Sequence, residues 1–143
     1  MQNSSGINLT MLCDFYELTM GNGYFAEGMD SRITYFDMFY RSIPDSGGYA
    51  VMAGLEQIVD YVKSLHFSQE DISYLAGRKL FKPEFLDYLR SFRFTGDIWA
   101  IPEGTPIFPG EPVITVRAPA IQAQLLETYM LLEFNHQSPI ATK

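Results

Sequence analysis

The segment 102–143 constrains the fold more than any other part of this sequence. A Pro-Gly pair at 109–110 predicts a turn, because proline fixes φ at the first corner and glycine tolerates the second. Apolar residues flank the pair on both sides, which predicts a hairpin or a tight corner. The pair Ala118-Pro119 then ends the second arm, since proline removes a strand donor and suits the first turn of a helix.

One long helix is predicted from Ala120 to about Asn135. Its apolar residues go nearly all the way round, and they are Ile121, Leu125, Leu126, Met130, Leu131, Leu132 and Phe134. A helix with this pattern is buried on most sides. The chain stops at Thr142-Lys143 without a glycine cap or a polar tail, so we expect a truncated chain. We also expect the chain to self-associate, or to contact a second chain, through Leu131, Leu132 and their neighbours.

Composition excludes several classes of partner. The formal net charge is −7, which disfavours nucleic acid and anionic membrane surfaces, because both need clustered Lys and Arg. No apolar run reaches the roughly 18 residues of a membrane span, and the sequence shows no basic-plus-apolar leader that would suggest export. The single cysteine, Cys13, cannot form an internal disulfide and fits a reducing cytoplasm. A catalytic Cys13 would need a basic partner, and none is nearby in sequence.

The domain organisation predicted from the sequence is a loose start, residues 1–8, followed by one domain, residues 9–143. Within the domain, Asp14 is a good N-cap for a first helix, and Glu17 stands where the return partner of a capping box belongs. Gly28 is the expected end of this helix. No linker or internal repeat divides the chain.

The first helix carries two different faces. One face, with Phe15 and Leu18 at helical spacing, is typical of a core. The other combines Tyr16, Thr19 and Gly23, a mixture that suits contact with another surface or with a flat ligand. The alternative is that Tyr16 is a boundary tyrosine whose hydroxyl lies in water.

The middle of the chain predicts a mixed α+β fold. Residues 32–40 are rich in aromatic and β-branched side chains and predict a strand covered on both faces, except at Asp37. A loop is expected at 44–48, and a helical stripe runs from 53 to 65. Two further helices are expected, one capped by Ser68 with Asp71 and one opened by Pro83, before a strand at 98–101.

The sequence contains no established catalytic or metal-binding motif. It lacks a Walker loop, a dinucleotide fingerprint, Cys-x-x-Cys and Gly-x-Ser-x-Gly. His66 stands at the end of a predicted helix, where the dipole favours a structural role. His136 has no second histidine at ligand spacing, so a metal site is not expected.

Several short segments nevertheless resemble the nicotinate phosphoribosyltransferase family. Residues 12–20 read LCDFYELTM, which resembles the family's amino-terminal Asp-x-Tyr-x-x-Thr-Met segment. The resemblance continues through residues 48–51, 53–55, 85–89, 92–97, 102–105, 124–128 and 140–143. It covers almost the whole chain from about Leu9 in one collinear register, which makes chance a poor explanation.

The resemblance implies a reaction and a place in metabolism. Enzymes of this family transfer ribose 5-phosphate from phosphoribosyl pyrophosphate to the ring nitrogen of nicotinate and release pyrophosphate. They couple this transfer to ATP hydrolysis through a phosphorylated histidine and feed NAD synthesis. For the complete enzyme, ATP and Mg²⁺ are therefore the implied cofactors, and a cytoplasmic location is expected.

The resemblance also implies how the work is divided between domains. The family's amino-terminal α+β domain precedes an incomplete α/β barrel, which carries the phosphate sites, the phosphorylated histidine and the arginines that read nicotinate. This chain ends where the barrel should begin, so we expect no catalytic residue and no bound cofactor in it. Neither His66 nor His136 matches the phosphorylated position.

The implied substrate-binding residues are Tyr16, which in the family stacks on the pyridine ring, with Asp14 and Thr19 of the same segment. In the family this segment reaches the active site of the neighbouring subunit. A homodimer is therefore the implied assembly, or a second chain that supplies the barrel.

Other readings remain open at this point. Quinolinate phosphoribosyltransferase shares the outline, but its helix usually carries Glu-Arg-Thr, and here the same place reads Glu127-Thr128-Tyr129 without the arginine that holds a dicarboxylate. Nicotinamide-specific relatives also share Asp-x-Tyr. A biotinyl or lipoyl carrier would need an exposed lysine at the corner that holds Pro109-Gly110. A binding or dimerisation module without chemistry of its own is the remaining alternative.

Overall fold

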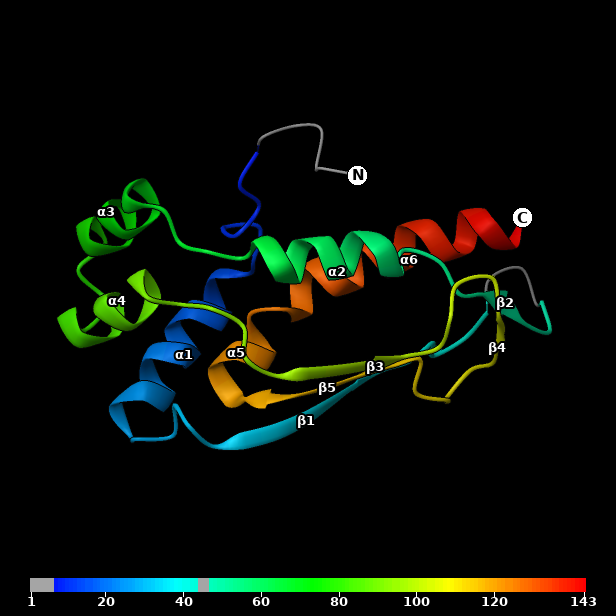
Figure 1. The fold of residues 1–143 in the computed structure, drawn as a ribbon, viewed down its shortest axis with the longest axis horizontal. Helices are drawn as coiled ribbons and strands as arrows, with labels where there is room; N and C mark the ends of the chain where they lie inside the picture. The colour runs from blue at the N-terminus through cyan, green and yellow to red at the C-terminus, as the bar shows by residue number, and fades with distance from the viewer. Residues whose placement is uncertain (1–6, 44–46) are drawn as a thin grey trace.

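The computed structural model describes residues 7–43 and 47–143, and Figure 1 shows how its elements are arranged. In chain order the elements are α1 (Phe15–Ala26), β1 (Ile33–Met38), β2 (Ala50–Val51), α2 (Leu55–Ser64), α3 (Gln69–Gly77), α4 (Pro83–Arg90), β3 (Asp97–Ala100), β4 (Pro106–Ile107), β5 (Ile114–Pro119), α5 (Ala120–Gln124) and α6 (Glu127–Thr142). The predicted α+β class is confirmed. Most of the predicted loose start, and residues 44–46 of the predicted loop, lie outside the described residues.

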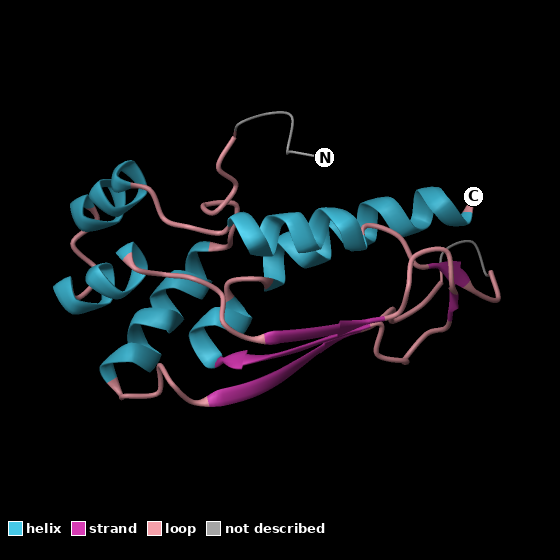
Figure 2. Cartoon of the chain, viewed as in Figure 1, coloured by secondary structure: helices cyan, strands magenta, loops and turns pink. Residues whose placement is uncertain are grey.

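The main sheet has three antiparallel strands in the order β1-β5-β3. Alternate residues of the middle strand β5 are buried, namely Ile114, Val116 and Ala118. They face the helical side of the sheet, where α5 contacts both β1 and β5. Figure 2 shows the helices gathered on that side of the sheet. The core therefore lies between one face of this sheet and the helices.

The other face of the sheet is open. The prediction that both faces of β1 are covered is wrong, because Tyr35 is 64% exposed and Phe39 is 47% exposed. β1 is an edge strand, so its aromatic content indicates strand formation without showing which face is buried. Asp37 lies on the open face, where its Oδ1 accepts a hydrogen bond from Thr115 Oγ1 at 2.6 Å.

The Pro-Gly pair forms a corner rather than a hairpin. Gly110 has a φ of 79°, in the left-handed region that favours glycine. Its N–H donates to the Tyr40 carbonyl at 2.8 Å. The strands on its two sides do not pair with each other, since β4 pairs with β2 while β5 pairs with β1 and β3. The corner thus passes the chain from the small sheet to the main one.

The single long helix predicted after Pro119 is wrong, because the chain forms two helices. The first, α5, is buried along its whole length, and the second, α6, continues to Thr142. They are separated at Leu125 and Leu126, whose side chains are both buried. Burial on most sides is also wrong for α6, since Leu131 and Leu132 are 41% and 51% exposed.

The remaining helices follow their local signals. The capping box that opens α3 is confirmed, because Asp71 N–H donates to Ser68 Oγ at 3.2 Å and Ser68 N–H donates to Asp71 Oδ2 at 2.7 Å. Pro83 opens α4, and Gly28 follows α1 with a φ of 69°. In the part of the chain that is described, no helix has the length and apolar character needed to cross a bilayer.

Candidate functional site

The first turn of α1 does not form the predicted capping box. Asp14 occupies the N-cap with extended dihedral angles, as expected, but its carboxylate makes no capping hydrogen bond. The Glu17 side chain turns into the interior instead, where the residue is only 1% exposed. The prediction that Glu17 caps its own helix by bonding back to Asp14 is therefore wrong. Its carboxyl caps a different helix.

Glu17 caps the start of α6. Its Oε1 accepts hydrogen bonds from the Thr128 backbone N–H at 3.2 Å and from Thr128 Oγ1 at 2.7 Å. Thr128 is the second residue of α6, so this N–H is one that an α-helix leaves without an internal partner. Leu126, at the N-cap of α6, has no side-chain acceptor of its own. The carboxyl thus supplies the cap at the point where α5 ends and α6 begins.

The same hydroxyl joins α6 to the start of α1. Thr128 Oγ1 donates to Glu17 and accepts from the Asp14 backbone N–H at 3.2 Å. Two residues after Asp14, Tyr16 Oη donates at 3.2 Å to Oε1 of Glu127, the residue before Thr128. Consecutive residues of α6 therefore hold consecutive parts of the first turn of α1.

The Glu17 carboxyl lies in an unusual electrostatic environment. Its pKa is raised to about 7, mainly by burial and to a smaller extent by the Glu127 and Asp14 carboxylates, against the lowering effect of the two Thr128 hydrogen bonds. Its Oε2 is buried without a hydrogen-bond partner among the described residues. Burial also raises the pKa of the neighbouring Cys13 thiol to about 12. A thiol with this pKa is protonated at neutral pH, in line with a Cys13 that is not a nucleophile.

The face that carries Tyr16, Thr19 and Gly23 is exposed, and of the predicted core face Leu18 is buried, whereas the prediction for Phe15 is wrong, since it is 43% exposed at the start of the helix. Tyr16 is 45% exposed, and partial desolvation together with Glu127 raises its phenol pKa, so its hydroxyl stays protonated. Thr19 Oγ1 donates to the Tyr16 carbonyl at 3.1 Å, which occupies the hydroxyl within its own helix. A Cβ at Gly23 would meet nothing within 4 Å. The ring of Tyr16 thus stands at an open surface with its hydroxyl fixed.

Two hollows share Glu127 and Leu131 in their lining. One, of about 510 Å³, is lined by Asp14, Glu127, Thr128, Leu131, Leu132, Asn135 and His136. The other, of about 350 Å³, is lined by Phe36, Asp37, Met38, Val116, Ala123, Glu127, Met130 and Leu131. Both combine apolar side chains with carboxylates, and no Lys or Arg stands among these lining residues. An anionic ligand would therefore find no lysine or arginine counter-charge in either hollow.

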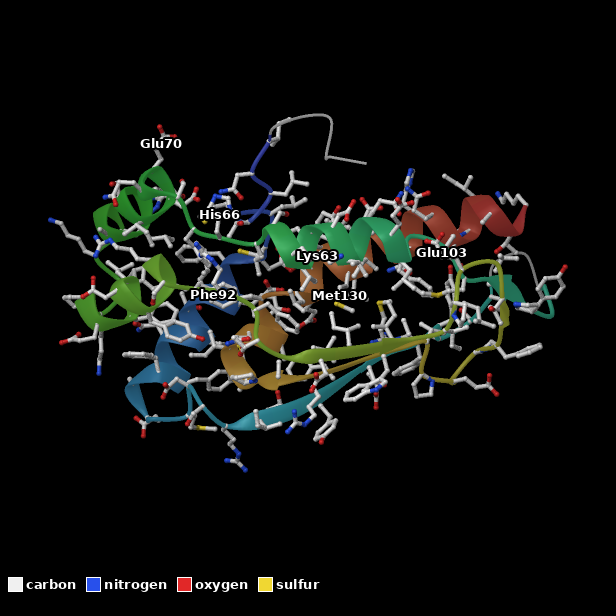
Figure 3. All side chains as sticks on the ribbon, viewed as in Figure 1. Lys63, His66, Glu70, Phe92, Glu103 and Met130 are labelled. Carbon is white, nitrogen blue, oxygen red and sulfur yellow. The ribbon has the colours of Figure 1, made fainter. Side chains whose placement is uncertain are left out.

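The two histidines lie in different places. His66 follows α2, close to the start of the chain, and its Nδ1 is 2.7 Å from the Ser64 carbonyl. Figure 3 shows His66 far from Glu103, at the other end of α2. His136 lines the larger hollow with Asp14. Within residues 7–43 and 47–143, no group of three or more His, Cys, Asp or Glu is placed to hold a metal ion.

Glu127 and Thr128 are the site residues that sequence reasoning did not assign. Both belong to the segment 124–128 that carries the family resemblance, but nothing local connects them to α1. Glu127 is 111 residues from its partner Tyr16, and Thr128 is 111 residues from its partner Glu17. Only a three-dimensional structure or covariation between the two segments could identify such a pair.

Comparison with known proteins gives one consistent match. The family model for the nicotinate phosphoribosyltransferase (NAPRTase) N-terminal domain matches residues 11–135. The chain is 44% identical over 133 residues to nicotinate phosphoribosyltransferase pncB2 of Mycobacterium tuberculosis, which covers 93% of this chain and 28% of that protein. It is 38% identical over 136 residues to nicotinate phosphoribosyltransferase of Bacillus subtilis, covering 95% and 28%. The chain thus spans little more than a quarter of the length of these relatives.

Solved structures agree with this match. The crystal structure of human nicotinic acid phosphoribosyltransferase superposes with a TM-score of 0.84 at 32% identity, over 90% of this chain and 26% of that chain. Nicotinate-nucleotide pyrophosphorylase of Pyrococcus furiosus superposes with a TM-score of 0.65 at 17% identity, over 94% and 27%. The second likeness concerns the fold alone.

Proposed function

This chain belongs to the nicotinate phosphoribosyltransferase family through its amino-terminal domain, and we propose that it is that part of an enzyme joining nicotinate to phosphoribosyl pyrophosphate. The products would be nicotinate mononucleotide and pyrophosphate, with ATP hydrolysis, in NAD biosynthesis. The observation that carries this proposal is the collinear match over residues 11–135, together with the fold shared with the human enzyme. We also propose that the complete enzyme acts as a ligase, in the sense that it couples bond formation to ATP hydrolysis, and that it is located in the cytoplasm.

The contribution that we assign to this chain is the ring of Tyr16. Nicotinate is flat and electron-poor, so an electron-rich phenol stacks on it better than an aliphatic side chain. The half-exposed ring and the hydrogen bond from its hydroxyl to Glu127 support this role, because the bond fixes the ring while a face stays accessible. Asp14 lines the adjacent hollow, and Thr19 stabilises the turn that carries Tyr16.

The residues that recognise charge are proposed to lie in the remainder of the enzyme. A nicotinate carboxylate needs a cationic partner, whereas the surroundings of Tyr16 hold Asp14 and Glu127. Among the described residues, no three or more His, Cys, Asp or Glu side chains are grouped to hold a metal ion. We therefore assign the ATP, Mg²⁺ and pyrophosphate sites and the phosphorylated histidine to the region that follows in the relatives.

The proposed assembly is a homodimer, or a complex with a second chain, in which Tyr16 serves the neighbouring subunit's site. The exposed leucines of α6, Leu131 and Leu132, support an extended contact surface next to Tyr16. They line the hollow that also includes Asp14, so a neighbouring subunit covering α6 would reach the start of α1.

A dicarboxylate substrate such as quinolinate is the second candidate, and the geometry disfavours it. In the segment Glu127-Thr128-Tyr129, the Thr128 side chain is used by Glu17, and Tyr129 stacks on Tyr61 with ring centroids 3.9 Å apart. Neither side chain can supply the cation that a second carboxylate requires.

The proposal is tested by assaying nicotinate mononucleotide formation with nicotinate, phosphoribosyl pyrophosphate, ATP and Mg²⁺. We expect turnover from a polypeptide that joins this chain to the region following it in the relatives. The 143-residue chain alone should give no product, because nothing in it positions the ribose carbon or stabilises departing pyrophosphate. Turnover proportional to the concentration of the 143-residue chain would contradict this division of labour.

Mixed dimers test the assignment across the interface. One subunit carries Tyr16→Ala and the other is disabled in its barrel, so a shared site should combine the barrel of the first with the tyrosine of the second. Recovery of normal nicotinate affinity on mixing is the expected result. If dimers form and no such site is recovered, Tyr16 does not act in the neighbouring subunit.

A further inference from the structure

We infer that Glu17 is a positioning residue, which acts through Thr128 to hold the first turn of α1, and with it Tyr16, in one orientation against α6. The expected effect of Glu17 on nicotinate binding rests on the proposed function. Its effect on the orientation of Tyr16 depends only on the contacts in the structure. Glu17 does not line either hollow described beside Glu127, so it is not assigned a contact with substrate.

The first step of the inference is the burial of the carboxyl. Glu17 is 1% exposed although it lies on the same helix turn as Tyr16, which is 45% exposed. Burying a carboxyl is unfavourable unless hydrogen bonds compensate for lost hydration, and here only one oxygen is compensated. A surface carboxyl at this position would avoid that cost. The burial of Glu17 is therefore explained by the two hydrogen bonds that its Oε1 accepts from Thr128, rather than by solubility or simple packing.

The second step is the chain of contacts from Glu17 to the site. The Thr128 hydroxyl donates its single hydrogen to Glu17 Oε1, so its lone pairs point elsewhere, and one of them accepts the Asp14 N–H. Without the Glu17 acceptor this hydroxyl is free to rotate. The anchor of the helix start, at Asp14 and two residues from Tyr16, would be weakened, because no lone pair of the hydroxyl is then held toward the Asp14 N–H.

The third step is the direction of α6. The Thr128 N–H at the start of α6 is bonded to Glu17, and Glu127, the preceding residue, accepts from Tyr16. Glu17 and Glu127 thus sit on two sides of one helix end. Displacing the cap would move Glu127 relative to the phenol that it holds, so both contacts of the first turn depend on Glu17.

The test compares Glu17→Met, which keeps the volume and removes the acceptor, with Glu17→Gln, which keeps an oxygen for Thr128. Glu27→Met, at the exposed end of the same helix, is the matched control. In the 143-residue chain, backbone amide order parameters of Asp14 and Tyr16 should be near 0.85 in the wild type and fall below about 0.6 in Glu17→Met. Glu17→Gln and Glu27→Met should keep the wild-type values.

In the complete enzyme the same variants are compared by KM and kcat. Glu17→Met should raise the apparent KM for nicotinate about fivefold, which corresponds to the order of a stacking contribution. The KM for phosphoribosyl pyrophosphate should stay within about twofold, and Glu17→Gln should restore the nicotinate KM. A general loss of folding would instead lower kcat and the active fraction without this split.

Thr128→Val provides a second route, since it removes the hydroxyl that links Glu17 to Asp14 and keeps the shape of the side chain. It should loosen Asp14 and Tyr16 as Glu17→Met does. If both variants leave the order parameters unchanged, Glu17 does not position Tyr16 and the inference is overturned. If the wild-type enzyme forms no nicotinate mononucleotide, the proposed function fails instead, while the order parameters still decide the positioning role.

Discussion

Helices α2 and α6 are both capped at their N-termini by the carboxyl group of a glutamate from a distant part of the chain. At α2, Glu103 Oε1 accepts from the N–H groups of Gly54, Leu55 and Glu56 at 3.0, 2.7 and 3.3 Å. Figure 3 shows Glu103 beside this helix end. At α6, Glu17 performs the same task for Thr128. In both places the N-cap residue, Gly54 or Leu126, has no side-chain acceptor.

The two caps differ in their access to water. Glu103 is exposed, so water can reach the N–H groups that it covers if the side chain moves away. Glu17 is buried, and one of its oxygens has no hydrogen-bond partner in the described part of the chain. An exposed cap is thus replaceable at small cost, whereas a buried cap fixes two helices against each other. The buried one lies beside the residue that we assign to nicotinate.

The largest expected effect is the loss of the buried cap. Glu17→Met leaves the Thr128 N–H and hydroxyl without their acceptor in the interior, and each unsatisfied group costs roughly 1–3 kcal/mol. We expect the free energy of unfolding to fall by about 3 kcal/mol at pH 5, measured by urea denaturation. Glu27→Met, on the exposed end of α1, should stay within about 0.5 kcal/mol. Equal effects of the two substitutions would contradict the buried cap.

The next effect is a pH dependence that only the buried cap should produce. The pKa of Glu17 is raised from 4.5 to about 7, with Asp14 and Glu127 as the facing carboxylates and Cys13 and Tyr61 as neutral neighbours. A raised pKa means that the folded chain binds the proton more tightly than the unfolded chain. The stability from this group is therefore fully present below pH 4.5 and is lost as the pH rises through 7.

Each pKa unit corresponds to about 1.36 kcal/mol, and relaxation around the charge reduces the sum, so we expect a loss of about 2 kcal/mol between pH 4.5 and 8. Glu17→Gln should remove this slope, and Glu103→Gln should leave it in place. Urea denaturation across this pH range measures both. A wild-type slope that survives in Glu17→Gln would assign the titration to another group.

The exposed cap should give a smaller effect. Glu103→Ala removes the acceptor of three N–H groups at the start of α2, but water can replace it. Loss of an N-cap costs about 0.5–2 kcal/mol, and we expect about 1.5 kcal/mol here. Thermal unfolding monitored by circular dichroism measures it, with Glu70→Ala on the surface of α3 as a comparison. A loss larger than that of Glu17→Met would reverse the order of the two caps.

Local signals account for the parts of the fold that the sequence predicts. The Ser68 capping box, Pro83 at the start of α4 and the turn at Gly110 each depend on residues within a few positions of one another. Each of these features depends on a local constraint, which is a side-chain cap, the fixed φ of proline or the positive φ of glycine. Such a constraint acts on the residues of the same short segment. Helical spacing also groups Tyr16 with Thr19 and Gly23, but it does not set exposure, because Phe15 of the predicted core face is 43% exposed.

The failures have a common origin in contacts between distant segments. Asp14 and Glu17 fit a local capping box, but Thr128, 111 residues from Glu17, competes for the same carboxyl. The break between α5 and α6 contains no glycine or proline. Leu125 and Leu126 are good helix formers, so the helix ends there because of tertiary contacts and not because of local propensity. The open face of β1 likewise depends on which neighbours cover it, which composition does not encode.

The smallest effect is the most direct test of the claim that this chain supplies the Tyr16 ring to the nicotinate site. In the complete enzyme, Tyr16→Ala should raise the apparent KM for nicotinate about fivefold, because stacking contributes on the order of 1 kcal/mol. Tyr16→Phe keeps the ring and should stay within about twofold, and the KM for phosphoribosyl pyrophosphate should hardly change in either. An unchanged nicotinate KM in Tyr16→Ala would contradict the account, and Tyr16 would then be a boundary tyrosine tied to Glu127.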